Sequence, residues 1–194
     1  RAIGLLAAAS MPAGGAEVER VLVVSGSCSP VTQRQIEYAV STGFADIAAD
    51  SEKLVRGGAL AAAEIERLIC ASLQALECGQ SPLVHTAKGP DDARIAATAS
   101  VFAEQGYSEL DIKLRSGEVF GRILGEILAA LAERTGLRRA CVAGGDTSAY
   151  AARALGVQAL QVVGPMAPGS PLCRVHSRSA AIDGMEITFK GGQV

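Results

Sequence analysis

The feature that most constrains the fold is a short apolar segment followed at once by two glycines and a group of side-chain oxygens. Residues 140–143 suit a buried strand, and Gly144 and Gly145 permit backbone conformations closed to other residues. Asp, Thr and Ser follow at 146–148, where a helix over 148–155 is predicted to begin. Glycine amides and the unpaired N–H groups of a first helical turn suit an anion such as phosphate. The segment therefore predicts an anion site, with a strand-to-helix turn that binds nothing as the alternative.

A second junction, near the beginning of the chain, repeats this design. Residues 21–24 are apolar, hydroxyl groups follow at Ser25, Ser27 and Ser29, and Pro30 stands where a helix would begin. Two hydroxyl- and glycine-rich junctions in one chain favour the anion site over a chance turn.

Strand and helix alternate along most of the chain. Further strands are expected over 44–49, 82–86 and 159–163, and helices over 31–42, over 59–77, from a cap at Asp91 to about 105, and from a cap at Ser116 to Gly136. Asp183-Gly184 lies between strand-like runs, which predicts a hairpin. We therefore expect a three-layer α/β domain with a mainly parallel sheet and an antiparallel C-terminal hairpin. The charges of the 59–77 helix, Glu64 among them, are expected on its solvated face.

Polar segments follow four of the expected strands, and ligands of such sheets bind beyond the carboxyl ends of the strands. These segments are 25–29, 86–88, 144–148 and 190–192. Lys88 is a weak candidate for a phosphate contact, with solvent exposure as the favoured alternative. Neither G-x-x-x-x-G-K-[ST] nor G-x-G-x-x-G occurs, which disfavours a P-loop NTPase and a typical Rossmann dehydrogenase.

Composition limits the partners and the compartment. Acidic and basic residues are interspersed with a net charge of -2, aromatics make up 4% and there is no Trp, so we do not expect a nucleic-acid partner. The apolar stretches are shorter than the roughly 20 residues of a spanning helix, so no membrane partner is expected either. Five cysteines without a C-x-x-C pair indicate a reducing, cytoplasmic location. Cys28 is interpreted as a small filler rather than as a nucleophile.

Four segments together resemble the C-terminal nucleotide-binding domain of the four-carbon acid sugar kinases. They are 25–36, 144–148, 163–169 and 189–194, and they occur in the family's order from the first strand to the last residue. The resemblance implies a two-domain enzyme that uses ATP to phosphorylate a tetronate or related sugar acid, a small-molecule substrate that an N-terminal domain of the same polypeptide holds. Residues 1–16 are then a tail or linker from that preceding domain, and 17–194 are the nucleotide-binding domain. A homo-oligomer is left open.

The resemblance also implies site residues. The nucleotide contacts fall on Ser25, Ser27 or Ser29, on Gly144, Gly145, Asp146, Thr147 and the adjoining Ser148, and on Gly192 of the final loop. The chain departs from the family pattern at its end, where Lys190-Gly-Gly-Gln-Val stands in place of Lys-Ser-Gly-Asn-Phe-Gly.

Asp146 has two interpretations. Its carboxylate could hold or orient Mg²⁺ beside the phosphates, directly or through water, or it could simply cap the following helix. No catalytic base is identified. A non-catalytic nucleotide-binding module and a different enzyme that binds phosphorylated metabolites stay as alternatives, since a fold alone does not decide between functions.

Overall fold

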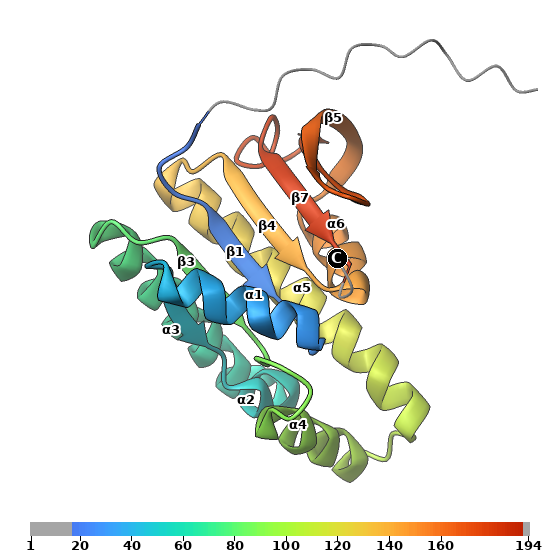
Figure 1. The fold of residues 1–194 in the computed structure, drawn as a ribbon. Helices are drawn as coiled ribbons and strands as arrows, with labels where there is room; N and C mark the ends of the chain where they lie inside the picture. Colours follow the sequence, from blue (N-terminus) through green and yellow to red (C-terminus); the bar gives the residue numbers. More distant parts are fainter. Residues whose placement is uncertain (1–16, 192–194) are drawn as a thin grey trace, which may run out of the picture.

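A seven-stranded sheet forms the middle layer of the computed structural model, which describes residues 17–191 (Figure 1). The strands are, in chain order, β1 (Leu22–Ser25), β2 (Ala45–Ala48), β3 (Pro82–His85), β4 (Arg139–Ala143), β5 (Val157–Ala167), β6 (Ser170–Ser177) and β7 (Glu186–Lys190). Their order in the sheet is β2-β3-β1-β4-β7-β6-β5. The first five of these are parallel, whereas β6 pairs antiparallel with β7 and β5 pairs antiparallel with β6. The expected mainly parallel sheet with an antiparallel C-terminal part is confirmed.

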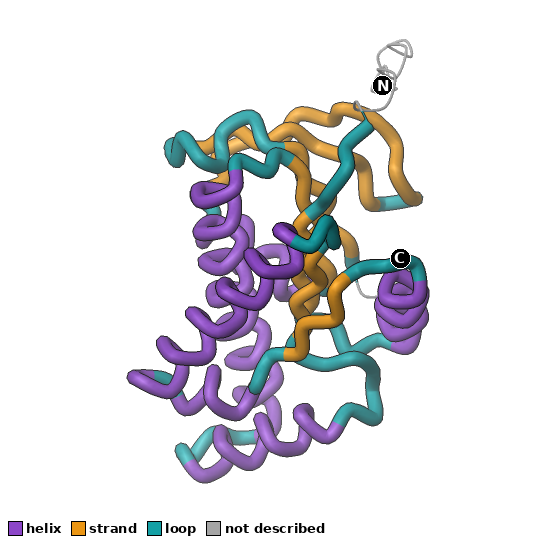
Figure 2. Tube along the Cα trace, turned by 90° about the vertical axis from the view of Figure 1, so that its left-hand side faces the viewer, coloured by secondary structure: helices purple, strands orange, loops and turns teal. Residues whose placement is uncertain are grey.

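Helices cover both faces of the sheet. They are α1 (Pro30–Ser41), α2 (Ser51–Arg56), α3 (Gly58–Glu77), α4 (Ala93–Glu104), α5 (Glu109–Thr135) and α6 (Gly145–Ala154). Figures 1 and 2 show α1 on one face and the other helices on the opposite face. The expected three layers are therefore present.

The long helix α5 supplies much of the core. Ile123, Ile127 and Leu131 recur at intervals of four, as expected, and each is at most 1% exposed. The helix ends at Gly136, which adopts the left-handed conformation (φ 67°) that glycine tolerates, and its N–H donates to the Ala132 carbonyl. This C-terminal boundary was predicted correctly.

The N-terminal boundaries of two helices differ from the prediction. α5 begins seven residues before Ser116, because Ser108 caps it by accepting from the Asp111 N–H, whereas the Ser116 hydroxyl donates to a carbonyl inside the helix. α4 is capped by Asp92 rather than Asp91, since the Asp92 carboxylate accepts from the N–H two residues later. The segment before Ser116, which was not predicted as helix, is the mostly exposed first part of α5.

Two further expectations are corrected on the side of the sheet where α2 and α3 lie. The short helix α2 was not predicted; Asp50 caps it by accepting from the Lys53 N–H. Glu64 does not face solvent but is only 2% exposed, since its carboxylate accepts from the Asp50 N–H and from the Arg67 guanidinium. Paired in this way, a carboxylate is tolerated inside the fold.

The C-terminal hairpin exists, with a different first strand. β6 ends at Ser177, and residues 181–184 are turns rather than a strand. Asp183 and Gly184 lie in the connection to β7, where the Gly184 N–H donates to the Val175 carbonyl. The antiparallel pairing of β6 with β7 confirms the hairpin itself.

Candidate functional site

The carboxyl ends of the parallel strands meet at one edge of the sheet. Ser25 of β1 is in register with His85 of β3 and Ala143 of β4, and Ala143 is in register with Lys190 of β7. The last parallel strand thus runs in the direction that brings its polar end to the same edge. The ends of these four strands therefore lie at one edge of the sheet.

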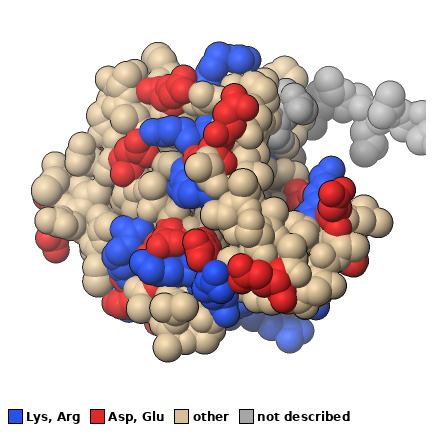
Figure 3. Space-filling model, turned by 90° about the horizontal axis from the view of Figure 1, so that it is seen from below, with Lys and Arg blue, Asp and Glu red and all other residues tan. Residues whose placement is uncertain are grey.

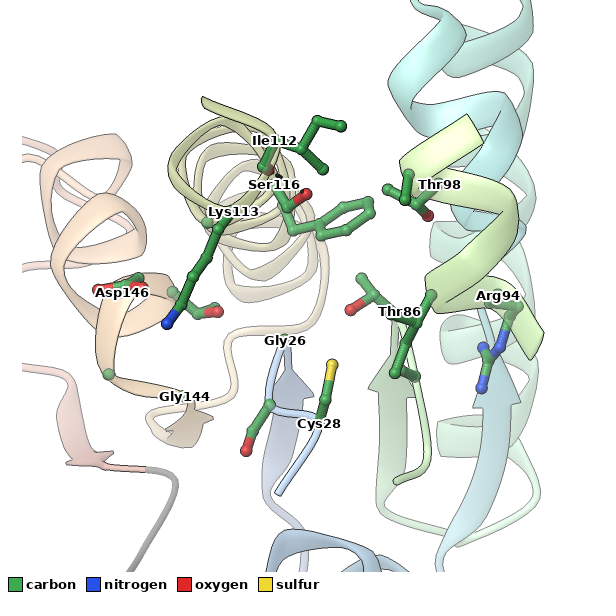
Figure 4. A pocket seen from close by; sticks show the side chains of 18 of the residues that line it. Gly26, Cys28, Thr86, Arg94, Thr98, Ile112, Lys113, Ser116, Gly144 and Asp146 are labelled. Atoms are coloured by element: carbon green, nitrogen blue, oxygen red, sulfur yellow. Dashed lines mark hydrogen bonds between the residues drawn. The ribbon is translucent and has the colours of Figure 1, made fainter. Parts of the chain in front are cut away.

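A cavity of about 380 Å³ opens between this edge and the helices α4, α5 and α6. Figure 4 shows its walls, with the glycine turn and Asp146 on one side and α4 on the other. The residues that line it come from the turn after β1, the segment after β3, the three helices and the Gly-Gly turn; they are Gly26, Ser27, Cys28, Thr86, Ala87, Arg94, Ile95, Thr98, Ala99, Glu109, Ile112, Lys113, Ser116, Gly117, Phe120, Gly144, Gly145, Asp146 and Thr147.

The first turn of α6 presents unpaired backbone amides to this cavity. Gly144 is the N-cap residue, with φ 120°, and its N–H donates to the Lys190 carbonyl. The next three amides, of residues 145–147, have no acceptor within residues 17–191. Three N–H groups and the positive end of a helix dipole therefore lie at the wall of the cavity, which is an arrangement suited to an anion.

The interpretation of Asp146 as a helix cap is wrong. The helix begins one residue before it, at Gly145, and Gly144 is an N-cap without a side-chain hydrogen bond. Asp146 therefore lies inside the first turn, where its side chain is one of those lining the cavity. The carboxylate is left available to something in the cavity.

The two glycines of the turn serve different purposes. A Cβ on Gly145 would meet no atom within 4 Å, so this residue leaves the amides open to the cavity. A Cβ on Gly144 would lie 2.8 Å from Thr147 Oγ1, and one on Gly26 would overlap the same oxygen. The 3%-exposed Thr147 is thus enclosed by Gly26 and Gly144, which fixes the start of α6 against the turn after β1.

A row of glycines on α5 determines how closely α6 approaches. These residues, Gly117, Gly121 and Gly125, lie four apart on one helix face. A Cβ on the first would lie 2.9 Å from Asp146 Cβ, and one on the last 2.8 Å from Ala154 Cβ. The row therefore sets the position of Asp146 at the cavity wall. We refer to these three residues as the glycine row.

Lys113 lies one helical turn before the glycine row, and Figure 4 shows its side chain extending toward Asp146. The ammonium group of Lys113 forms no ion pair or hydrogen bond with any residue in the described range 17–191. A cation and a carboxylate thus flank the free amides of α6. Sequence reasoning missed Lys113, although the Ser108–Asp111 capping pair was a signal that the helix already begins before it.

Of the three serines expected in the first turn, only Ser27 lines the cavity. Ser25 is 1% exposed and its hydroxyl accepts from the Ser27 N–H, while Ser29 caps α1, which begins at Pro30 as predicted. The Ser27 hydroxyl lies 2.9 Å from Thr32 Oγ1.

The remaining expected residues divide in the same way. Thr147 lines the cavity, but Ser148 does not, and its hydroxyl instead faces the Val142 carbonyl at 3.4 Å. Lys190, at the end of β7, donates to Thr32 Oγ1 (3.1 Å). Burial lowers the pKa of its ammonium group. Gly192 lies outside the described residues.

Lys88 does not reach the cavity. Its ammonium group donates to Asp46 Oδ2 (2.5 Å), and the other oxygen of that carboxylate lies 2.7 Å from His85 Nε2. Arg94 donates to His85 Nδ1, so the neutral tautomer with its proton on Nε2 satisfies both partners. Burial lowers the pKa of His85, against the hydrogen bond to Asp46, which raises it.

Cys28 lines the cavity but is not activated. Burial of the thiol raises its pKa, and the nearby charge of Asp92 acts in the same direction. A protonated thiol is a poor nucleophile. Cys28 is exposed and lines the cavity, so it is not the small buried filler that was expected, whereas the raised pKa agrees with the expectation that it is not a nucleophile.

Magnesium has few candidate ligands here. Within residues 17–191 there is no group of three or more His, Cys, Asp and Glu side chains that could hold a metal ion. Mg²⁺ is commonly bound through one or two carboxylates, water and substrate phosphates, and a single carboxylate beside a phosphate site fits that requirement. Asp146 is the side chain in question.

The sheet order, the strand-end cavity and the unpaired amides define a nucleotide-binding type of α/β domain. The comparison with protein families agrees: residues 22–194 match the nucleotide-binding C-terminal domain family. The chain belongs to this family, the C-terminal domain of the four-carbon acid sugar kinases.

Several curated kinases are similar to the chain. A 3-oxo-isoapionate kinase of Paraburkholderia graminis is 41% identical over 197 residues, which cover 100% of this chain and 40% of that protein. A 3-oxo-tetronate kinase of Cupriavidus necator is 34% identical over 77% of the chain and 30% of its own length. A D-threonate kinase of Salmonella typhimurium is 25% identical over 89% of the chain and 39% of its length. The chain thus spans less than half the length of the relatives that it matches.

Solved structures share the fold. A Haemophilus influenzae protein superposes with a TM-score of 0.64 at 20% identity, over 94% of this chain and 39% of that one. A Bordetella bronchiseptica protein, solved with bound citrate as a domain-swapped dimer, gives 0.62 at 22% identity over 90% of this chain and 37% of that one. These likenesses confirm the α/β architecture.

The surface at the strand-end edge carries charges of both signs. Figure 3, seen from below the view of Figure 1, shows acidic and basic side chains interspersed on this face. None of the helices between residues 17 and 191 is long and apolar enough to cross a membrane.

Proposed function

We propose that the chain is the ATP-binding part of a kinase that phosphorylates a four-carbon sugar acid of the tetronate or 3-oxo-tetronate type. The observation that carries the proposal is the row of three unpaired amides at the start of α6, beside the Asp146 carboxylate. The names of the longer relatives support the substrate class. On this proposal, residues 1–16 lead from an N-terminal domain that holds the sugar acid, 17–194 bind ATP, and the enzyme works in the cytoplasm.

Each part of the polar end of the cavity has a role in this proposal. The amides of residues 145–147 bind phosphate oxygens, with Ser27 and Gly192 as further contacts, and Asp146 holds Mg²⁺ directly or through water. Neutralising the charge on the transferred phosphoryl group is the chemistry that Mg²⁺ supplies. The protein's own contribution is to hold the phosphates in line with the acceptor hydroxyl.

The charge of Asp146 provides the sharpest test. Because Asp146 is not a helix cap, Asp146→Asn should change stability by less than about 1 kcal/mol, while turnover of the full-length enzyme falls by orders of magnitude and its magnesium dependence changes. Asp91→Asn is a matched control, since Asp91 is exposed and does not line the cavity. Unchanged turnover and magnesium dependence in Asp146→Asn would refute the metal role.

A second experiment separates this proposal from a non-catalytic module that binds nucleotides or phosphorylated metabolites. The 194-residue chain should bind ATP-Mg weakly in calorimetry and should not phosphorylate tetronates, whereas the full-length protein should do both. Binding without turnover in the full-length protein would favour the module. A folded chain that gives no heat with millimolar ATP or ADP would contradict the nucleotide proposal.

A further inference from the structure

The proposed phosphate contacts occupy only one end of the cavity, and its other end has no assigned ligand. Opposite the glycine turn, its walls are a slot between α4 and α5, formed by side chains that are mostly apolar. These are Ile95 and Ala99 of α4 and Ile112 and Phe120 of α5. An apolar slot continuous with a polar anion site is the form of cavity that takes a ligand with one flat apolar part and one charged part.

One polar group is buried in this slot without a partner. Thr98 is 4% exposed, and its hydroxyl oxygen is the single buried side-chain N or O atom between residues 17 and 191 that makes no hydrogen bond. The side chain lines the cavity, and Figure 4 shows it pointing from α4 toward α5. An unpartnered buried hydroxyl destabilises a fold. The oxygen is closed to the cavity in this rotamer, and it reaches a ligand when Thr98 turns to the other rotamer that threonine adopts in helices. A partner from outside the chain then explains why the hydroxyl is there.

We propose that the slot between α4 and α5 binds the base of the nucleotide and that the Thr98 hydroxyl forms a hydrogen bond with the edge of that base. The inference rests on the proposed function and assigns the end of the site that it left open. The side chains of Ile112 and Phe120 can cover the flat faces of a base. Contact between an aromatic ring and a base is favourable for every base, because each has a flat π-face. A hydroxyl both donates and accepts, so it matches either a ring nitrogen or an amino group.

This placement gives the nucleotide one direction in the cavity. With the base between α4 and α5, the phosphates extend past Lys113 to the amides of residues 145–147. Figure 4 places Lys113 between Thr98 and Asp146. The ammonium group of Lys113 then meets the phosphates and has no part in holding the base.

Two ligands and four variants test the inference by calorimetry on the 194-residue chain. Thr98→Val keeps the shape of the side chain but removes the hydroxyl; it should weaken ATP-Mg binding roughly ten- to a hundredfold and leave binding of inorganic tripolyphosphate-Mg unchanged. Lys113→Gln should weaken the binding of both ligands by a similar factor.

Two further variants are controls. Thr98→Ser retains the hydroxyl and should bind ATP as the wild type does. Ser100→Ala is the matched control, because this hydroxyl of α4 is exposed and donates to the Ala96 carbonyl of its own helix.

Stability measurements keep the result interpretable. Thr98→Val removes a buried group without a partner, so it should be at least as resistant to urea as the wild type. Equal ATP affinity in Thr98→Val and wild type would overturn the base slot, and so would an equal loss in Thr98→Val and Thr98→Ser, which would indicate packing rather than a hydrogen bond. Either result leaves the proposed function intact. A wild-type chain that binds neither ATP nor tripolyphosphate would overturn both proposals.

Discussion

In the glycine row of α5, we expect a glycine-to-alanine substitution to destabilise the fold, although alanine normally stabilises a helix. Gly121→Ala places a methyl group in the middle of a helix, where alanine is normally better than glycine by about 1 kcal/mol. Here the new Cβ would lie 2.6 Å from Tyr150 Cβ and 2.9 Å from the Thr147 carbonyl oxygen. Neither atom can be moved by rotating a side chain. The two helices therefore have to separate.

The magnitude follows from these two opposing effects. Overpacking costs about 1–3 kcal/mol, and contacts with backbone and Cβ atoms place this site toward the upper value. Subtracting about 1 kcal/mol of helix propensity leaves a loss of about 2 kcal/mol in the free energy of unfolding. For a domain of this size that corresponds to a Tm lower by about 4–8 °C. ATP affinity should fall as well, because Thr147 belongs to the first turn of α6.

Urea denaturation and calorimetry with ATP provide the measurements. Gly145→Ala is the matched control for stability, since its Cβ would meet nothing within 4 Å, and it should be as stable as the wild type or slightly more so. Gly125→Ala, whose Cβ would lie 2.8 Å from Ala154 Cβ at the far end of α6, should lower stability without lowering ATP affinity. If Gly121→Ala is as stable as the wild type, α6 does not depend on the glycine row.

Two predictions concern buried ionisable groups. Because burial lowers the pKa of His85, the unfolded chain binds a proton more readily, and stability should decline as pH falls below about 6.5. His85→Gln should flatten this decline in urea midpoints, and the exposed His176→Gln should not. Glu64→Gln should lower the free energy of unfolding by roughly 2 kcal/mol, because the charge that meets Arg67 (2.6 Å) is lost inside the fold, whereas the exposed Glu66→Gln should change it little. A loss of equal size in both glutamate variants would contradict this account.

The sequence was sufficient to predict the edge of the sheet at which the site lies. Short apolar runs such as 21–24 and 140–143 are too brief and too continuous for amphipathic helices, and each is followed by a turn rich in glycine and hydroxyl groups. Once the sheet is parallel, its strand ends must meet at one edge. The Ser27 turn and the Gly144–Gly145 turn were therefore placed together from sequence, and the structure confirms that both line one cavity.

The other wall of the cavity was not predicted, for a physical reason. Residues 109–118 of α5 extend beyond the core, so they lack the continuous apolar stripe by which helices are recognised, and Leu110 and Leu114 are 71% and 58% exposed. Gly117 lies inside the helix predicted from Ser116, but no local pattern gives it a packing role. Its actual role, contact with Asp146 Cβ, depends on a helix that is distant in sequence and cannot be inferred from local propensity.

The basic residues at this edge show why charge alone does not identify the phosphate contacts. Lys88 stood out in the sequence, yet Asp46 takes up its ammonium group, and every N–H of the Arg94 guanidinium is directed at Asp92, at His85 or at the Ala49 carbonyl. An arginine held in this way braces the ends of β2 and β3 and has no donor left for a ligand. The donors proposed for the phosphates are instead the amides at the start of α6 and the Lys113 ammonium group. Since all of these lie on the Asp146 side of the cavity, an anionic group has one end at which to bind, and the uncharged part of its molecule is directed toward Thr98.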